Sequence, residues 1–123
     1  QVVKATFISA DSDTLARAQA DLDDAFHVIP GSITMPGGSN GEIAQLGVNK
    51  GSAIVEVLDA LGLDAADSVG IGDSWNDVEM FDVVGTAVAM GGADPELHAR
   101  ADLVTTGVLD DGVHGALVRL GLV

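Results

Sequence analysis

The chain of 123 residues carries nineteen acidic against five basic side chains, a formal net charge of −14, and its composition is 47% hydrophobic but only 3% aromatic. This length suits a single compact domain with an aliphatic core, and the negative charge argues against binding to nucleic acid or to anionic membrane surfaces. The absence of cysteine excludes disulfides and thiol chemistry, and no apolar run approaches the roughly 18 residues of a membrane span, so we expect a cytoplasmic protein.

The first part of the chain predicts a small α+β unit. Apolar and β-branched runs indicate strands, apolar side chains at three- and four-residue spacing indicate a helix, and a cluster of Pro, Gly, Ser and Asn indicates a turn. We expect a strand over residues 2–9, a helix over 14–26, a strand over 27–35 interrupted by Pro30 and Gly31, a turn over 36–41 and a strand over 42–46. The unit is expected to end near Gly47.

From Lys50 onward, helical periodicity alternates with short apolar runs, which is typical of βαβ units around a parallel sheet. Gly62 and Gly85 stand where helix ends favour a left-handed residue. Asp94 and Pro95 are suited to be the N-cap and the first residue of a helix. The expected elements are a helix over 51–61, a strand over 68–72, a helix over 76–84, a strand over 86–90, a helix over 95–101, a strand over 102–105 and a helix over 112–121.

The segment GDSWNDVEM, residues 72–80, places the carboxylates of Asp73 and Asp77 where a buried strand ends and a helix begins. In an open α/β sheet, ligands bind at this end of the strands. A cation such as Mg²⁺ takes one or two protein carboxylates and completes its shell with water and phosphate oxygens. Alternatively, Asp73 or a neighbouring polar residue simply caps the following helix. Lys50, at the head of the preceding helix, favours the functional interpretation.

Several motifs occur in a fixed order: GVNKG, the strand ending in GDSWNDVEM, TAVAMGGADPELHARADLVT and DDGV. This succession resembles the C-terminal half of a Cof-type phosphatase of the haloacid dehalogenase-like (HAD) superfamily, and it runs from about Gly41 to Leu120. The resemblance implies an α/β fold in which residues 48–123 are the C-terminal half of a three-layer Rossmann-like core with a partial parallel sheet. Residues 1–47 would be the end of an α+β cap domain, which covers the active site and recognises the non-phosphate part of the substrate.

The resemblance also implies roles for individual residues. Asp73 would bind Mg²⁺ directly, and Asp77, the second acidic residue of the motif, would act on the metal site by pairing with Lys50 or with a metal-bound water. Lys50 would offset the charge of the nucleophile and of the phosphoryl group in transfer. Asn76 would donate a hydrogen bond near the phosphate or the nucleophile, and Ser74 would shape the loop. The structural alternatives are a surface lysine at position 50 and a helix cap at Asn76.

HAD phosphatases use a nucleophilic Asp in a D-x-D-G-T motif, and the segment from Asp11 to Leu15, DSDTL, only superficially matches it. The Gly is absent, and the separation from Lys50 is too short for the intervening part of the core. We therefore interpret Asp11, Ser12 and Asp13 as capping the helix that follows. The nucleophile is missing, and because the chain begins with Gln1 rather than Met, we expect it to be a piece of a longer or split protein.

We therefore expect a magnesium-dependent phosphatase that hydrolyses a small phosphomonoester, such as a sugar phosphate, through an aspartyl-phosphate, with this chain inactive alone. A phosphomutase with the same type of cap fits equally. The alternative from another class is a noncatalytic acidic α/β module that binds a divalent cation or a protein partner, and a D-x-D-G-T motif upstream would decide for the enzyme. In the family, strand 68–72 lies beside the nucleophile-bearing strand, so we expect self-association through this open edge unless the N-terminal half is present.

Overall fold

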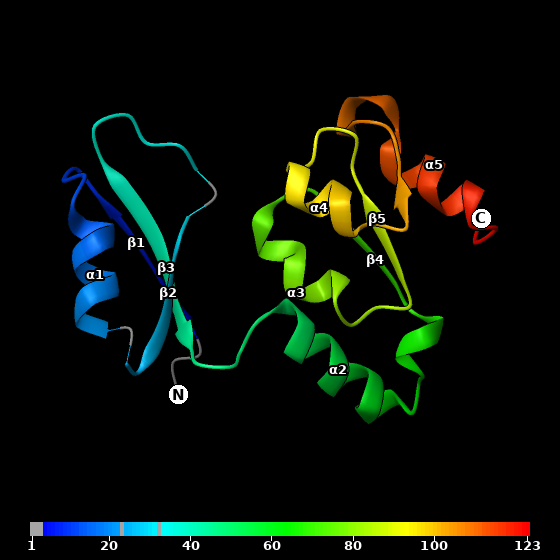
Figure 1. Ribbon diagram of the computed structural model, residues 1–123, viewed down its shortest axis with the longest axis horizontal. Helices are drawn as coiled ribbons and strands as arrows, with labels where there is room; N and C mark the ends of the chain where they lie inside the picture. Colours follow the sequence, from blue (N-terminus) through cyan, green and yellow to red (C-terminus); the bar gives the residue numbers. More distant parts are fainter. Residues whose placement is uncertain (1–3, 23, 32) are drawn as a thin grey trace. The chain divides into compact units, whose positions relative to one another are not determined.

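A computed structural model describes residues 4–22, 24–31 and 33–123, and the chain divides into two compact units, Gln1–Val48 and Asn49–Val123 (Figure 1). We call them the first and the second unit. The division falls directly after Val48, next to the boundary expected near Gly47. In the part of the chain that the structure describes, no helix has the length and apolar character needed to cross a membrane.

The first unit has the expected α+β organisation. Its three strands form an antiparallel sheet in the order β1-β3-β2, and the buried side chain of Val28 identifies the covered face of this sheet, which faces α1. The elements are β1 (Lys4–Ser9), α1 (Thr14–Leu22), β2 (Phe26–Pro30) and β3 (Ser39–Gln45).

Three boundaries in the first unit differ from expectation. The strand predicted over residues 27–35 ends at Pro30, the first residue of the predicted interruption, and residues 33–35 are not part of a strand. The strand predicted to begin at residue 42 begins at Ser39, and the last part of the predicted turn is therefore paired with β1. Gly41 explains the extension, because an added Cβ would lie 2.5 Å from the Phe7 ring, and glycine lets the two strands approach. The helix predicted to reach Phe26 ends at Leu22, and Phe26 instead pairs with Gln45 in the sheet.

The second unit is built on a parallel sheet in the order β4-β5-β6, as the alternating pattern predicted. In Figure 1, α3 and α4 lie to one side of β4 and β5, and α5 lies to the other. The elements are α2 (Lys50–Leu61), β4 (Val69–Gly72), α3 (Val78–Phe81), β5 (Thr86–Ala89), α4 (Pro95–Arg100), β6 (Leu103–Val104) and α5 (Gly112–Arg119), with short 3-10 turns at η1 (Ala65–Asp67), η2 (Trp75–Asp77) and η3 (Val108–Asp110).

The core of the second unit lies around β5, which is the central strand. Val88 and Ala89 are fully buried, and they point to opposite faces because side chains alternate along a strand. Ala89 belongs to the cluster that α3 and α4 close with Phe81 and Leu97. Small residues in β5 let these helices pack closely, so the polar ends of β4 and β5 are held on a rigid base.

Two glycines and one helix of the second unit can be compared with the local predictions. Gly62 ends α2 in the left-handed conformation, with φ of 67°, as predicted. Gly85 does not have positive φ; it is required because a Cβ there would lie 2.0 Å from the backbone oxygen of Ala66. The helix predicted over residues 76–84 is divided: it begins as η2, where the N–H of Asp77 donates to the carbonyl of Ser74, and continues as the single turn α3, which ends at Phe81.

Candidate functional site

The loop that follows β4 carries the candidate site, and Asp77 determines its shape. The Asp77 side chain is only 6% exposed. Its Oδ2 accepts hydrogen bonds from the N–H groups of Asp73 at 3.0 Å and Ser74 at 3.3 Å. Gly72 leaves the necessary space, since a Cβ there would lie 2.7 Å from the Cβ of Asp77. The buried carboxylate thus folds residues 73–77 around itself at the carboxyl end of the sheet.

The other oxygen of Asp77, Oδ1, forms an ion pair with the ammonium group of Lys50. Lys50 is the first residue of α2, and this helix is capped by Asn49, whose Oδ1 accepts from the N–H of Ser52 at 2.8 Å. Gly51 brings the helix against α3, because its missing Cβ would lie 2.3 Å from the backbone oxygen of Glu79. The expected pairing of Lys50 with Asp77 is therefore present, and it joins two elements that are distant in sequence.

Asn76 completes this polar group. Its Oδ1 accepts from the hydroxyl of Ser74 at 2.6 Å and from the Lys50 ammonium at 3.5 Å. A lysine ammonium has three donors and no acceptor, so one N–H of Lys50 stays available after these two contacts. Among the described residues, the amide Nδ2 of Asn76 has no hydrogen-bond partner. Lys50 and Asn76 thus offer two donors to an anion.

Asp73 is exposed, and it is the exposed carboxylate of the site, whereas Asp77 is buried. Its backbone is bound on both sides, but within residues 4–22, 24–31 and 33–123 its carboxylate has no hydrogen-bond or ion-pair partner. A free carboxylate at the carboxyl end of a parallel strand fits a hard divalent cation that keeps several waters. Because no three His, Cys, Asp or Glu residues gather within the described part of the chain, the remaining ligands would have to be water, substrate or residues from elsewhere.

For Asp77 the geometry favours contact with a metal through water over direct ligation. A carboxylate offers about four lone-pair positions, and Asp77 uses three of them for Lys50, Asp73 and Ser74. One position is left, which suits a hydrogen bond from a metal-bound water. Asp77 was expected both to pair with Lys50 and to act at the metal site; the pairing is present, and the metal contact stays a prediction.

Asp94 also contacts this loop, and the sequence did not predict that contact. It was expected to cap its own helix α4, but its side chain makes no capping hydrogen bond. Its Oδ2 instead accepts the N–H of Trp75 at 2.9 Å. The only signal in the sequence is the pair Asp94 and Pro95, which indicates a helix start and carries no information about a bond to a loop nineteen positions earlier.

Asp11, the superficial match to a nucleophile, lies in the first unit and on a different kind of sheet. It follows β1 of the antiparallel sheet, its Oδ1 accepts the N–H of Asp13 at 2.9 Å, and its Oδ2 contacts Arg17 at 3.4 Å. These contacts form the turn that leads into α1. Asp11 therefore has a structural role before α1, but through this turn rather than through the helix cap that was expected.

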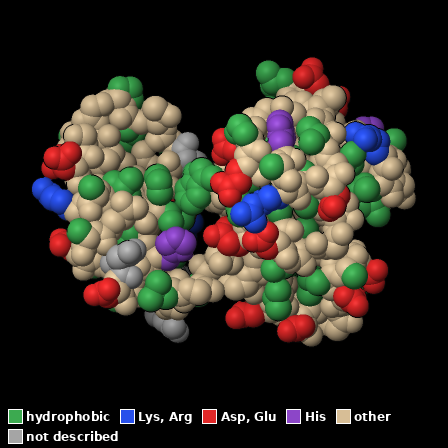
Figure 2. Space-filling model, viewed as in Figure 1, with side chains coloured by type: hydrophobic (Ala, Val, Ile, Leu, Met, Phe, Trp, Pro, Cys, Tyr) green, Lys and Arg blue, Asp and Glu red, His purple; other side chains and the backbone are tan. Residues whose placement is uncertain are grey.

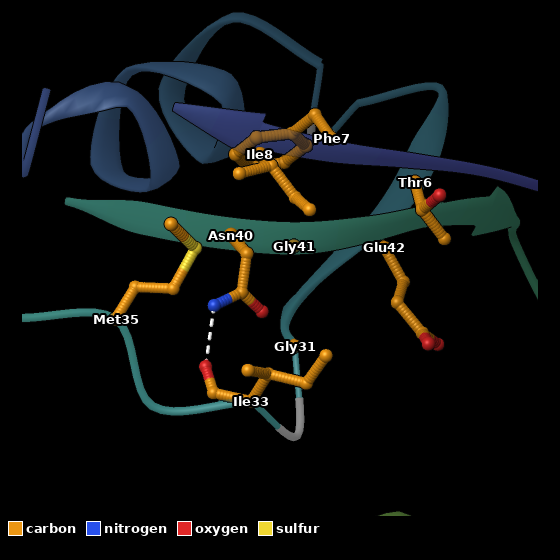
Figure 3. A pocket seen from close by; sticks show the side chains of 9 residues that line it. All are labelled: Thr6, Phe7, Ile8, Gly31, Ile33, Met35, Asn40, Gly41 and Glu42. Carbon is orange, nitrogen blue, oxygen red and sulfur yellow. Dashed lines mark hydrogen bonds between the residues drawn. The ribbon is translucent and has the colours of Figure 1, made fainter. Parts of the chain in front are cut away.

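A shallow hollow lies on the open face of the sheet of the first unit, lined by Ile8, Ile33 and Met35 with Asn40 and Glu42 at its edge (Figure 3). Two of its polar side chains are engaged: the Asn40 amide donates to the Ile33 carbonyl at 2.5 Å, and Glu42 pairs with Lys4. The hollow therefore offers an apolar surface and few free polar groups. Acidic side chains are visible over both units (Figure 2), in keeping with the net charge.

Comparison with known proteins adds independent information. A family model described as haloacid dehalogenase-like hydrolase matches residues 1–117. The phosphoglycolate phosphatase of Archaeoglobus fulgidus is 37% identical over 113 residues, which covers 90% of this chain and 51% of that protein. The 5-amino-6-(5-phospho-D-ribitylamino)uracil phosphatase YcsE of Bacillus subtilis is 36% identical over 85 residues, which covers 69% of this chain and 34% of that protein.

The fold is also found among solved structures. A haloacid dehalogenase-like hydrolase from Bacteroides thetaiotaomicron superposes with a TM-score of 0.80 at 25% identity, over 98% of this chain and 44% of that one. The chain thus spans about half, or less, of the length of these proteins.

Proposed function

Because the chain belongs to the haloacid dehalogenase-like hydrolase family, we propose that it is the part of a magnesium-dependent phosphatase that binds the metal and the transferring phosphoryl group. Two relatives that carry the name of phosphatases support this class of reaction. The proposal rests chiefly on one observation: the free carboxylate of Asp73 lies in a loop whose buried Asp77 is paired with Lys50.

In this proposal Asp73 holds Mg²⁺ directly, and Asp77 accepts a hydrogen bond from a metal-bound water. When bound, the cation would neutralise charge on the phosphate oxygens. This would also answer the objection that a chain with a net charge of −14 repels phosphate esters. The pair with Asp77 holds the Lys50 ammonium in one place, so that its free N–H can stabilise negative charge on the phosphoryl group.

Asn76 would donate its amide N–H to the phosphate or to the nucleophile, since its carbonyl oxygen is already occupied by Ser74 and Lys50. The nucleophile would be an Asp carboxylate from a segment outside these 123 residues. It would attack phosphorus, expel the alcohol of a small phosphomonoester such as a sugar phosphate, and form an aspartyl-phosphate that water hydrolyses. A location in the cytoplasm is part of this proposal, and cell fractionation would test it.

Metal-dependent turnover of the complete protein tests the proposal. We expect Asp73→Ala to abolish the release of phosphate from a panel of small phosphomonoesters at every Mg²⁺ concentration. The matched control is Asp59→Ala, which removes an exposed carboxylate of α2 and should leave turnover unchanged. Near-normal turnover of Asp73→Ala at saturating Mg²⁺ would contradict the assignment of Asp73.

The chain of 123 residues alone should not hydrolyse these substrates, because it lacks the nucleophile. Mg²⁺-dependent release of phosphate by this chain that disappears in Asp11→Asn would show instead that Asp11 is the nucleophile. Binding of Mg²⁺ by the complete protein without any turnover would favour the noncatalytic alternative.

A further inference from the structure

We propose that Asp94 is a positioning residue, which holds the loop of residues 73–77 through two bonds separate from those of Asp77 and thereby fixes the backbone that carries the Asp73 carboxylate. The inference rests on the proposed function of Asp73. Asp94 makes two contacts with this loop. Its Oδ2 accepts the N–H of Trp75 at 2.9 Å, and its own N–H donates to the carbonyl oxygen of Asp73 at 3.3 Å. The two contacts lie on either side of Ser74.

The backbone of the loop is consequently held by two different residues. Asp77 binds the N–H groups of Asp73 and Ser74, and Asp94 binds the carbonyl of Asp73 and the N–H of Trp75. The peptide groups before and after Asp73 both have partners, so rotation about the backbone of Asp73 breaks at least one hydrogen bond. The carboxylate of Asp73 has no partner among the described residues, so this backbone, which fixes the Cα–Cβ bond of Asp73, determines the region that the carboxylate can reach.

Asp94 can act as a fixed support because α4 is well anchored. Leu97 is fully buried in the core, and the Nε2 of His98 lies 2.9 Å from the carbonyl oxygen of Met90, the residue after β5. Asp94 stands at the N-cap position of α4, yet its carboxylate serves the loop rather than the helix. Hydrogen bonds that a carboxylate accepts from backbone N–H groups are stronger than neutral ones.

Position and charge can be separated experimentally. Asp94 brings a negative charge as well as an acceptor, and a nearby negative charge alone would also attract Mg²⁺. Asp94→Asn keeps an oxygen that can accept the Trp75 N–H and removes the charge, whereas Asp94→Ala removes both. The matched control is Asp64→Ala, because Asp64 accepts the N–H of Ala66 at the same distance of 2.9 Å, before η1 and outside the loop.

The experiment uses the complete protein with two measurements: hydrogen exchange of the Trp75 amide, and the Mg²⁺ concentration that gives half-maximal phosphatase activity. For Asp94→Ala we expect faster exchange at Trp75 and an increase in this Mg²⁺ concentration of about tenfold, the lower end of the effect of residues that support metal ligands. Activity at saturating Mg²⁺ should fall much less. Asp94→Asn should keep both the exchange at Trp75 and the half-maximal Mg²⁺ concentration near the wild-type values, and Asp64→Ala should alter neither.

Unchanged exchange and unchanged Mg²⁺ dependence in Asp94→Ala would overturn the inference. It would equally be overturned if Asp94→Asn matched Asp94→Ala in Mg²⁺ dependence while the Trp75 amide stayed protected, because charge would then be the cause. If Asp94→Ala does not fold, Asp94→Asn alone tests the inference. Positioning then requires that the exchange at Trp75 and the half-maximal Mg²⁺ concentration of Asp94→Asn stay close to the wild-type values. A wild-type protein without Mg²⁺-dependent activity overturns the proposed function, whereas an active wild type with an unaffected Asp94→Ala overturns only this inference.

Discussion

At the scale of single residues, the ion pair between Lys50 and Asp77 combines a half-exposed ammonium with a nearly buried carboxylate. Such a pair contributes little by its attraction alone, but the carboxylate left behind after removal of the lysine is costly, because burial deprives it of water. The two partners therefore respond differently to substitution. In the other ion pairs of the described residues, the carboxylate side chains are at least 26% exposed.

We expect Lys50→Met to lower the free energy of unfolding by about 1–2 kcal/mol, less than for a fully buried pair because the Lys50 side chain is 49% exposed. Urea unfolding of Lys50→Met and of a control variant measures this loss. Lys4→Met is the matched control, since Lys4 pairs with Glu42, whose side chain is 26% exposed, and we expect a loss of about 0.5 kcal/mol or less. Equal losses in the two variants would mean that burial of Asp77 has no energetic consequence.

At the scale of elements, the site depends on how closely α2 approaches α3. Gly51 makes this contact possible, and it is the only fully buried residue of α2. Lys50 precedes it directly, so any movement of the first turn of α2 displaces the Lys50 ammonium from Asp77.

Gly51→Ala should therefore separate the two helices, lower the free energy of unfolding by about 1–3 kcal/mol and reduce phosphatase activity of the complete protein. Denaturant unfolding and steady-state kinetics measure the two effects. Gly115→Ala in α5 is the control, because its Cβ would meet only the Thr105 hydroxyl at an ordinary 3.7 Å, and alanine is favoured over glycine within helices. A Gly51→Ala protein as stable and active as the control would show that the two helices can part without consequence.

The order and type of the elements could be predicted from the sequence, because strands and helices leave periodic patterns and Gly62 occupies a helix end. Boundaries were less accurate where a partner decides them. Ser39, Asn40 and Gly41 have the composition of a turn, yet pairing with β1 makes them a strand. Gly85 was assigned to a helix end, but the neighbouring Ala66 backbone is the reason for glycine.

In the candidate site, too, some contacts could be predicted from the sequence and others could not. The pairing of Lys50 with Asp77 could be expected from ordered motifs. The hydrogen bond from the Trp75 N–H to Asp94 could not be expected, because its donor is a backbone N–H that every residue except proline carries. Contacts of this kind depend on where α4 lies in space, and the type of the donor residue does not predict them.

At the scale of the whole molecule, the sheet of the second unit has an open side. β4 pairs with β5 on one side, and among the described residues no strand pairs with its other side. An unpaired strand edge can bind another strand through its backbone groups. We propose that this edge is covered by a segment outside these 123 residues in the complete protein.

The isolated chain is accordingly expected to self-associate through β4, and sedimentation equilibrium at several protein concentrations would detect this. The complete protein is the control, in which the amides of residues 69–72 should be protected from exchange without concentration-dependent association through this strand. A stable monomeric chain with a cooperative melt and protected amides over residues 69–72 would contradict the expectation.

The loop after β4 is held through the main-chain N–H groups of Asp73, Ser74 and Trp75, which bind the carboxylates of Asp77 and Asp94. Nineteen of the twenty amino acids supply such a group, and proline alone does not. The indole of Trp75 is therefore dispensable for these bonds, and any residue except proline at position 75 can make the same bond to Asp94. The side chain displayed beside the Asp73 carboxylate can thus change while the hydrogen bonds that hold the loop stay the same.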